Sequence, residues 1–229
     1  MPGPNHKPFI AARPVGGSYT FGGRQGRMSP TRQRAFHELV PRYAVTLPIP
    51  RDRPIIVEIG CGAGEATAAM AGGDDASLVI ACEPNAAMVA HLATLLDADG
   101  ITNVRLWVGD AFDLLAELGA ASVAELRVWF PDPWPKPRQA QKRLFTAQRL
   151  ALLTDALAVG GLLRLATDDA AYAAEALAAI ELEPRLAGAV VARPGERPIT
   201  RFEARGLHDG RSSVDIEARR VSRSGPRTS

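Results

Sequence analysis

Residues 128–136 combine reactive groups with a backbone that holds them still. The segment reads Val-Trp-Phe-Pro-Asp-Pro-Trp-Pro-Lys, so a carboxylate, an indole and an ammonium alternate with prolines. Proline fixes its own φ and drives the preceding residue toward extended geometry, which stiffens the loop carrying Asp132, Trp134 and Lys136. A stiff loop loses little entropy when it binds a ligand. The pattern indicates a built site, and the alternative is a proline-rich turn that binds nothing.

A glycine-rich turn lies between an apolar run and a helix-forming segment. It reads Glu58-Ile-Gly60-Cys-Gly62-Ala-Gly64, at the strand-to-helix turn where doubly wound sheets bind nucleotides. The glycines let the backbone approach a ligand closely, while an acid two residues earlier repels pyrophosphate but can orient an ammonium group. This spacing favours S-adenosylmethionine over NAD; a tight turn without a ligand is the alternative.

Two further acids stand at the ends of the next two apolar runs. Glu83 ends the second predicted strand, where a carboxylate can accept hydrogen bonds from both ribose hydroxyls of a nucleotide. Asp110 follows the third strand, where an acid can accept from an adenine amino group. Either acid alone is ambiguous, but acids at three successive strand ends indicate an adenosyl ligand.

These side chains need a sheet whose strands end at one edge. Short apolar runs alternate with helix-forming segments, which predicts an α/β fold with a doubly wound, mostly parallel, seven-stranded sheet covered by helices on both faces. We expect a helix from Ser29 or Thr31 to about Ala44. Strands are expected at 54–59, 78–83, 104–108, 123–130 and 162–166. Further helices are expected at 65–71, 86–96, 111–118, 143–158 and 169–180. Gly160-Gly161 is expected to end the helix at 143–158, and residues 190–221 hold two weaker strand candidates.

Length and composition fit one soluble α/β domain. The 229 residues carry a net charge of +2, but residues 1–53 carry +7, residues 54–192 carry −9 and residues 193–229 carry +4. Basic flanks around an acidic middle suggest phosphate-binding arms, or simply solvated tails. We expect a flexible basic arm at 1–28, a single domain at 29–221 and a polar tail at 222–229. With no membrane span, no secretory signal and no metal site from Cys61 and Cys82, the expected location is the cytoplasm.

Three segments together resemble one family, the bacterial tRNA (guanine-N7)-methyltransferases, whose fold is the class I, Rossmann-like methyltransferase fold. They are Phe21-Gly-Gly-Arg-Gln-Gly-Arg-Met, the Phe-Pro-Asp-Pro-Trp-Pro-Lys segment with the residues up to Arg143, and Pro198-Ile-Thr-Arg-Phe-Glu-Ala-Arg-Gly. The chain departs from the family where Pro137, Gln139, Ala140 and Gln141 interrupt a usually basic run. The resemblance implies transfer of a methyl group from S-adenosylmethionine to N7 of a variable-loop guanine, position 46, in tRNA, leaving S-adenosylhomocysteine.

The resemblance also implies roles for individual residues. Cofactor-binding residues are Glu58, Gly60, Gly62, Gly64, Glu83, Asp110 and Asp132, with Asp132 also catalytic, and tRNA guanosine contacts are Lys136, Asp168, Thr200, Arg201, Phe202 and Glu203. From the residues alone, Asp168 or Thr167 can instead cap the following helix, and Thr200–Glu203 can be an amphipathic edge strand. The oligomeric state, monomer or homodimer, stays open.

The reaction places modest demands on such a site. Guanine N7 already carries an in-plane lone pair, so the site must align the reactants and tolerate the positive charge that grows on the purine. Asp132 can accept a hydrogen bond from guanine N1–H or N2–H, and we interpret it as an orienting group first and a general base second. Trp134 can stack on the guanine or pack the loop onto the core. Rival hypotheses are a class I methyltransferase with another substrate, and an adenosyl-binding RNA-binding subunit without activity. A nicotinamide dehydrogenase fits less well because of the glycine spacing and Glu58.

Overall fold

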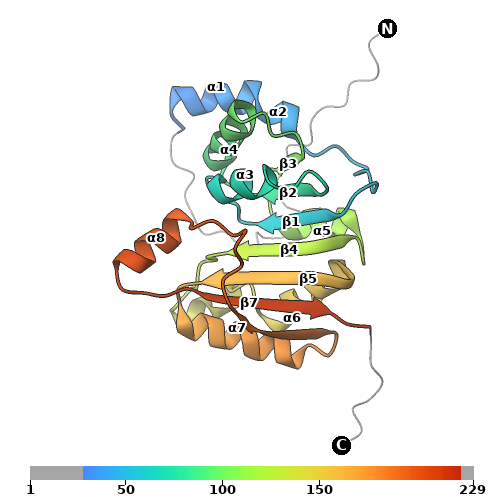
Figure 1. Cartoon of the computed structure of the whole chain (residues 1–229), viewed down its shortest axis with the longest axis vertical. Coiled ribbons are helices and arrows are strands. Elements are labelled where there is room, and N and C mark those ends of the chain that lie inside the picture. The colour runs from blue at the N-terminus through green and yellow to red at the C-terminus, as the bar shows by residue number, and fades with distance from the viewer. Residues whose placement is uncertain (1–27, 223–229) are drawn as a thin grey trace, which may run out of the picture.

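A computed structural model describes residues 28–222, which form a seven-stranded sheet with helices packed against it (Figure 1). The strand order is β3-β2-β1-β4-β5-β7-β6. The strands are β1 (Ile55–Ile59), β2 (Leu78–Cys82), β3 (Val104–Trp107), β4 (Val123–Trp129), β5 (Leu157–Thr167), β6 (Leu186–Val191) and β7 (Val214–Arg220). Strands β1 to β5 run parallel, whereas β7 pairs antiparallel with both β5 and β6. The predicted doubly wound, mostly parallel sheet is confirmed.

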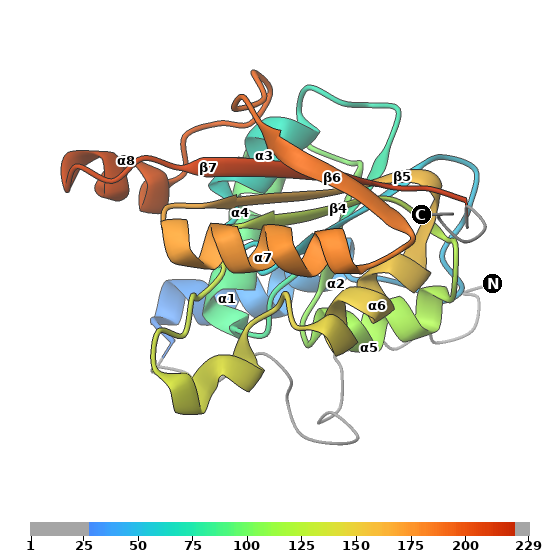
Figure 2. The same ribbon diagram turned by 90° about the horizontal axis from the view of Figure 1, so that it is seen from below.

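Helices cover the two faces of this sheet in separate groups. The helices α1 (Pro30–Glu38), α2 (Val40–Tyr43), α3 (Glu65–Ala71) and α4 (Ala86–Ala98) gather around β1, β2 and β3 (Figure 1). The opposite face is covered by α5 (Ala111–Leu118), α6 (Ala147–Ala156) and α7 (Ala170–Leu182), which lie along one side of the sheet in Figure 2. Because both faces of the inner strands are covered, those strands are apolar along nearly their whole length.

The N-terminal helix is interrupted once. Ser29 caps α1, its side chain accepting from the backbone N–H of Arg32 at 3.4 Å, and Pro30 occupies the first turn, as expected. The helix expected to run to about Ala44 instead breaks at Leu39 and restarts as α2. Pro41 explains the break, because it has no N–H to donate to the preceding turn. The expected basic arm lies almost wholly outside the described residues.

The largest correction concerns residues 137–167. The helix expected at 143–158 is present but shorter: it is α6, which Thr146 caps, and a short 3₁₀ helix, η1 (Pro137–Lys142), precedes it. Gly160 and Gly161 do not end a helix; both lie inside β5. The pairing of β4 with β5 shifts register between Val123 and Glu125, and a Cβ on Gly161 would lie 2.9 and 3.0 Å from two backbone oxygens there. Gly161 is therefore needed for a close approach of two strands, whereas Gly160 has nothing near its Cβ position and instead adopts a positive φ of 83°.

The C-terminal region contains a helix that sequence patterns did not reveal. Strand β6 begins at Leu186, earlier than expected, and α8 (Arg201–His208) separates β6 from β7. Thr200–Glu203 forms the start of this helix, so the edge-strand interpretation is wrong. In Figure 1, α8 lies beyond the sheet edge toward which the arrows of β1, β4 and β5 point. None of the helices within residues 28–222 is long and apolar enough to cross a membrane.

Replacement of Gly161 by alanine is predicted to destabilise the fold. The added Cβ would press on the carbonyl oxygens of Ala158 and Ala124, and overpacking against rigid backbone costs about 1–3 kcal/mol. Gly195→Ala is the matched control, because a Cβ there would meet nothing within 4 Å. Urea unfolding should show a clear loss of stability for Gly161→Ala only; equal stabilities of the two variants would contradict the close approach of β4 and β5 at Gly161.

Candidate active site

Two adjoining cavities open at the carboxyl ends of β1, β2 and β4. They have volumes of about 270 and 220 Å³ and share Gly60, Gly62, Trp129, Phe130 and Phe202 as lining residues. The first is also lined by Glu83, Asp132 and Trp134, and the second by Glu58, Thr200 and Arg201. Most of the side chains that the sequence singled out therefore lie around these two adjoining cavities, where open α/β sheets bind their ligands.

The glycine loop forms the floor of this space. Gly60, Gly62 and Gly64 all have positive φ, at 77°, 56° and 82°, a region that residues with a Cβ rarely adopt. A Cβ on Gly60 or Gly62 would meet nothing, so these two present open backbone to the cavity. A Cβ on Gly64 would lie 2.5 Å from Leu92 Cδ1. Gly64 lines neither cavity, and its small size instead lets α3 pack against α4.

Glu83 ties the glycine loop to the end of β2. Its Oε2 accepts from the Gly62 N–H at 3.1 Å, and its Oε1 accepts from the Asn85 N–H at 2.9 Å. Burial raises the pKa of this carboxyl group; the two N–H groups lower it in part, and the nearby charge of Asp132 raises it again. Each carboxylate oxygen keeps a free acceptor site, so Glu83 can still bind a pair of hydroxyl groups.

Glu58 is a buried carboxylate whose Oε2 makes no hydrogen bond. It is 2% exposed, it lines the second cavity, and burial raises its pKa from an ordinary value of 4.5 to about 6. Thr67 and Arg127 lower that pKa in part. An incompletely paired buried carboxylate is costly unless a cation binds beside it. Glu58 therefore fits the ammonium group of S-adenosylmethionine, as Glu83 fits its ribose hydroxyls.

Asp110 is placed differently from the other acids. Its Oδ1 caps α5 by accepting from the Phe112 N–H at 2.9 Å, and its carbonyl oxygen accepts from the Trp107 indole at 2.9 Å. The neighbours Gly109 and Ala111 line the cavity, while Asp110 itself is buried beside it. The structure thus assigns Asp110 a capping role and leaves its predicted contact with adenine as a prediction.

The Asp132 loop is held by contacts that sequence reasoning missed. Arg143 donates from Nε to the Pro133 carbonyl at 2.9 Å and from Nη2 to the Trp134 carbonyl at 3.1 Å, and it also pairs with Glu175 of α7. Phe130 and Trp134, at opposite ends of the loop, have positive φ values of 51° and 44°. Such backbone strain persists only where surrounding contacts impose it. The arginine clamp supplies those contacts and leaves Asp132 exposed to the cavity.

Trp134 and Lys136, both in this loop, have different surroundings. Trp134 lines the first cavity, and the Lys142 ammonium lies 4.6 Å from the centroid of its ring. Lys142 thus covers part of the indole by a cation–π contact, a role that sequence reasoning did not foresee. Lys136 is exposed just before η1 and lines neither cavity. Its position suits a phosphate at the rim more than a base inside.

The first turn of α8 forms the opposite wall. Thr200 caps the helix, its hydroxyl accepting from the Glu203 N–H at 3.1 Å, and Arg201 pairs with Glu65 Oε1 of α3 at 2.7 Å. Phe202 is 69% exposed and lines both cavities. These three predicted substrate residues do come together at the site. Glu203 turns away from the opening and is buried.

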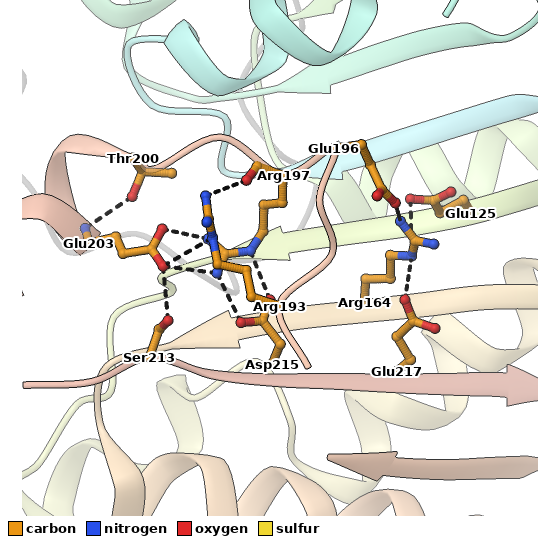
Figure 3. Close-up of polar contacts among 10 residues, drawn as sticks. All are labelled: Glu125, Arg164, Arg193, Glu196, Arg197, Thr200, Glu203, Ser213, Asp215 and Glu217. Carbon is orange, nitrogen blue, oxygen red and sulfur yellow. Dashed lines mark hydrogen bonds and ion pairs between the residues drawn. The ribbon is translucent and has the colours of Figure 1, made fainter. Parts of the chain in front are cut away.

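Glu203 belongs to a buried charge network (Figure 3). Arg197 donates two hydrogen bonds to Glu203, at 2.7 and 3.0 Å, and two to Asp215 of β7, at 2.8 and 2.9 Å. Ser213 also donates to Glu203 at 2.9 Å, and Arg193 lies 3.5 Å from the same carboxylate. These partners lower the pKa of Glu203 against the opposing effect of burial. Its carboxylate is committed to this network rather than presented to the cavity.

Asp168 lies farther along the α8 wall. Its Oδ2 accepts from Arg211 Nε at 2.8 Å, and Gly206 packs so closely that a Cβ there would lie 2.9 Å from the same oxygen. Asp168 lines neither cavity. The interpretation of Asp168 or Thr167 as cap of α7 is wrong, because Asp169 accepts from the Tyr172 N–H at 2.9 Å. Within residues 28–222, no three potential ligands gather closely enough to hold a metal ion.

The sequence is similar to those of known methyltransferases over most of its length. The sequence model of a family described as "Putative methyltransferase" matches residues 52–216. The tRNA (guanine-N(7)-)-methyltransferase of a Nocardioides species is 38% identical, covering 95% of this chain and 93% of the relative. The protein of the same description from Nitrosomonas europaea is 36% identical, with 84% and 92% covered.

Solved structures share the fold at low sequence identity. An rRNA methylase from Streptococcus thermophilus is 17% identical with a TM-score of 0.52, covering 82% of this chain and 93% of that one. A geranyl diphosphate C-methyltransferase from Streptomyces coelicolor, solved with S-adenosyl-L-homocysteine, is 18% identical with a TM-score of 0.52, covering 82% and 76%. At these identities the likeness establishes the fold.

Glu58→Gln is predicted to stabilise the protein without its ligand. The pKa of Glu58 is raised on folding, so its contribution to stability is present below pH 4.5 and is lost as the pH rises through about 6. Above pH 7 the buried charge should cost about 2 kcal/mol, since each pH unit between the two pKa values corresponds to about 1.4 kcal/mol. Urea unfolding should therefore show a gain for the variant at pH 7.5 that shrinks at pH 4.5. Glu117→Gln, on an exposed glutamate of α5, is the control; a loss for Glu58→Gln at pH 7.5 would contradict the account.

Proposed function

Since this chain belongs to the bacterial tRNA (guanine-N7)-methyltransferases, we propose that the cavity between the glycine loop, the Asp132 loop and α8 is where the methyl group is transferred. The enzyme transfers a methyl group from S-adenosylmethionine to N7 of a guanine in tRNA and releases S-adenosylhomocysteine. The observation that carries the proposal is the placement, around two cavities that share five lining residues, of a buried Glu58 whose Oε2 makes no hydrogen bond, a loop-bound Glu83 and an exposed Asp132. Residues 29–221 form the single methyltransferase domain in this proposal.

The cofactor half of the site holds one ligand by three kinds of contact. Glu58 binds the ammonium group, Glu83 accepts from the ribose hydroxyls, and Gly60 and Gly62 provide close backbone contact. Asp110 and Gly64 support this half of the site without lining it: Asp110 caps α5, and Gly64 lets α3 pack against α4. S-adenosylmethionine, when bound, supplies an electrophilic sulfonium methyl group.

The substrate half aligns a guanine whose N7 lone pair is already available. Asp132 accepts from the N1–H and N2–H edge and so orients the ring, and its charge stabilises the positive charge that develops on the purine. Phe202 and Trp134 provide aromatic surface on opposite walls. Thr200, Arg201 and Glu203 shape the α8 wall, while Lys136 and Asp168 lie outside the base pocket. No side chain has to remove a proton before attack.

The site is built from one chain, which supports activity as a monomer or as a homodimer with complete sites. The guanine is that of the variable loop, position 46, and the tRNA substrate supports a cytoplasmic location. The described site needs no metal ion, since alignment and charge stabilisation account for the transfer.

The function is tested with purified protein, labelled S-adenosylmethionine and unmodified tRNA. Label should enter the tRNA, and reduction followed by aniline should cut the chain at the labelled nucleotide, a reaction selective for 7-methylguanosine. Scission at position 46 is the expected result. Label without scission would assign another atom, and no label despite cofactor binding would favour a different substrate or a subunit that needs a partner. A tRNA lacking guanine at that position is the control.

Asp132→Asn is predicted to lower turnover strongly while S-adenosylmethionine still binds. The amide keeps the size of the side chain but loses the charge that stabilises the methylated purine, and loss of one such group costs on the order of 100-fold in kcat. Turnover by label incorporation and cofactor affinity by calorimetry separate the two effects. Asp99→Asn, on an exposed aspartate at the end of α4, should behave as wild type. Near-normal turnover of Asp132→Asn would remove Asp132 from the mechanism.

A further inference from the structure

Arg197 is fully buried, yet it carries a charge and does not line either cavity. It is 0% exposed, and its guanidinium is bound on two sides by carboxylates, Glu203 of α8 and Asp215 of β7. Burying a guanidinium with two carboxylates is costly unless the geometry of their hydrogen bonds is good. Four hydrogen bonds of 2.7–3.0 Å meet that condition here.

The same guanidinium also touches the base of the Asp132 loop. Its Cζ lies 5.7 Å from the centroid of the Trp129 ring and 5.6 Å from that of the Phe130 ring. Both rings line both cavities, and Phe130, with its positive φ, is the residue at which β4 turns into the Asp132 loop. Arg197 is therefore the point where α8, β7 and the start of that loop meet.

We propose that Arg197 is a positioning residue, which sets the spacing between the Asp132 loop and the Phe202 wall and thereby the alignment of the guanine. This inference rests on the proposed function, in which the base lies between these two walls. The hydrogen bonds to Glu203 fix the first turn of α8, including Phe202, and the ring contacts fix the origin of the Asp132 loop. A displacement of about 1 Å between such walls can reduce turnover on the order of 100-fold.

Only arginine suits this position. The planar guanidinium presents its N–H groups as a fixed fork that can bind two carboxylates in one plane while its face lies against aromatic rings. A lysine ammonium keeps the charge but cannot make both bidentate pairs. Arg197→Lys should therefore preserve charge balance while loosening the two walls, which makes it more informative than removal of the side chain.

A second arginine on the same sheet face provides a matched control. Arg164 of β5 pairs with Glu217 at 3.1 Å and with Glu196 at 2.7 Å, and it lies 3.7 Å from Glu125 (Figure 3). None of these four residues lines either cavity. Arg164→Lys thus removes a comparable set of charge contacts without touching a wall of the site.

The experiment compares both lysine variants in the full-length enzyme, with turnover expressed per cofactor-binding site. For Arg197→Lys we expect kcat to fall by at least about tenfold through misalignment. The KM for tRNA should stay within about threefold, because phosphate contacts supply much of the affinity for a nucleic acid. The affinity for S-adenosylmethionine should also be kept, since Glu58 and Glu83 are untouched. Arg164→Lys should retain wild-type turnover per site.

A purely structural role predicts something else. Arg197→Lys would then lose stability and functional sites, but each remaining site would turn over at the wild-type rate, which would overturn the proposal. An equal fall in Arg164→Lys would overturn it as well. If Arg197→Lys does not fold, Asp215→Asn takes its place: it alters the β7 side of the network and leaves all cavity-lining residues unchanged. A fall in kcat with unchanged cofactor affinity is again expected, and wild-type turnover would overturn the proposal.

Phe202→Ala separates this inference from its premise. Near-normal turnover of that variant would remove the aromatic wall from the reaction and overturn the premise together with the inference. A large loss for Phe202→Ala, combined with wild-type turnover per site for Arg197→Lys, would overturn the positioning role alone and leave the proposed function standing.

Discussion

The parallel pairing of β1 with β2 and with β4 is the constraint on which the site depends. Glu58 lies beside Ala81 on one side and Arg127 on the other, so these three strands end within one residue of the same level. The residues just beyond that level, the glycine loop, Glu83 and the Asp132 loop, must then share one edge of the sheet. A slip of one residue in any pair would turn alternate side chains to the opposite face and separate the acids.

Two glutamates show how differently a buried carboxylate can be used. Glu203 is fully paired with Arg197 and Ser213, so its burial helps to fix the position of α8. Glu58 is equally buried but lacks a partner at Oε2, and its raised pKa reflects the cost of holding a charge there. The first arrangement stabilises the architecture. The second lowers stability in the free protein, and in the proposed function the ammonium group of the cofactor offsets that cost.

Local sequence patterns predicted the elements well wherever one physical signal dominated. Continuous apolar runs identified the inner parallel strands, and Ser29-Pro30 identified the start of α1, because burial and capping act over a few residues. Predictions failed where two signals competed. Gly160-Gly161 resembles a helix terminator, but Gly161 allows a close approach between β4 and β5, and the short amphipathic segment after Thr200 suited a strand as well as a helix. In both places the partner that decides the outcome is distant in the chain.

Neighbouring residues were enough to predict the fold class, the glycine loop, the acids at the strand ends and the proline-flanked Asp132, since each depends on contacts within one turn or one strand. The support of those groups depends on contacts between distant segments: Arg143 holds the Asp132 loop, and Arg197 joins α8 to β7. The reason is the range of the interactions. Capping and strand periodicity are encoded in adjacent residues, whereas an ion pair between segments far apart exists only once register and packing bring them together.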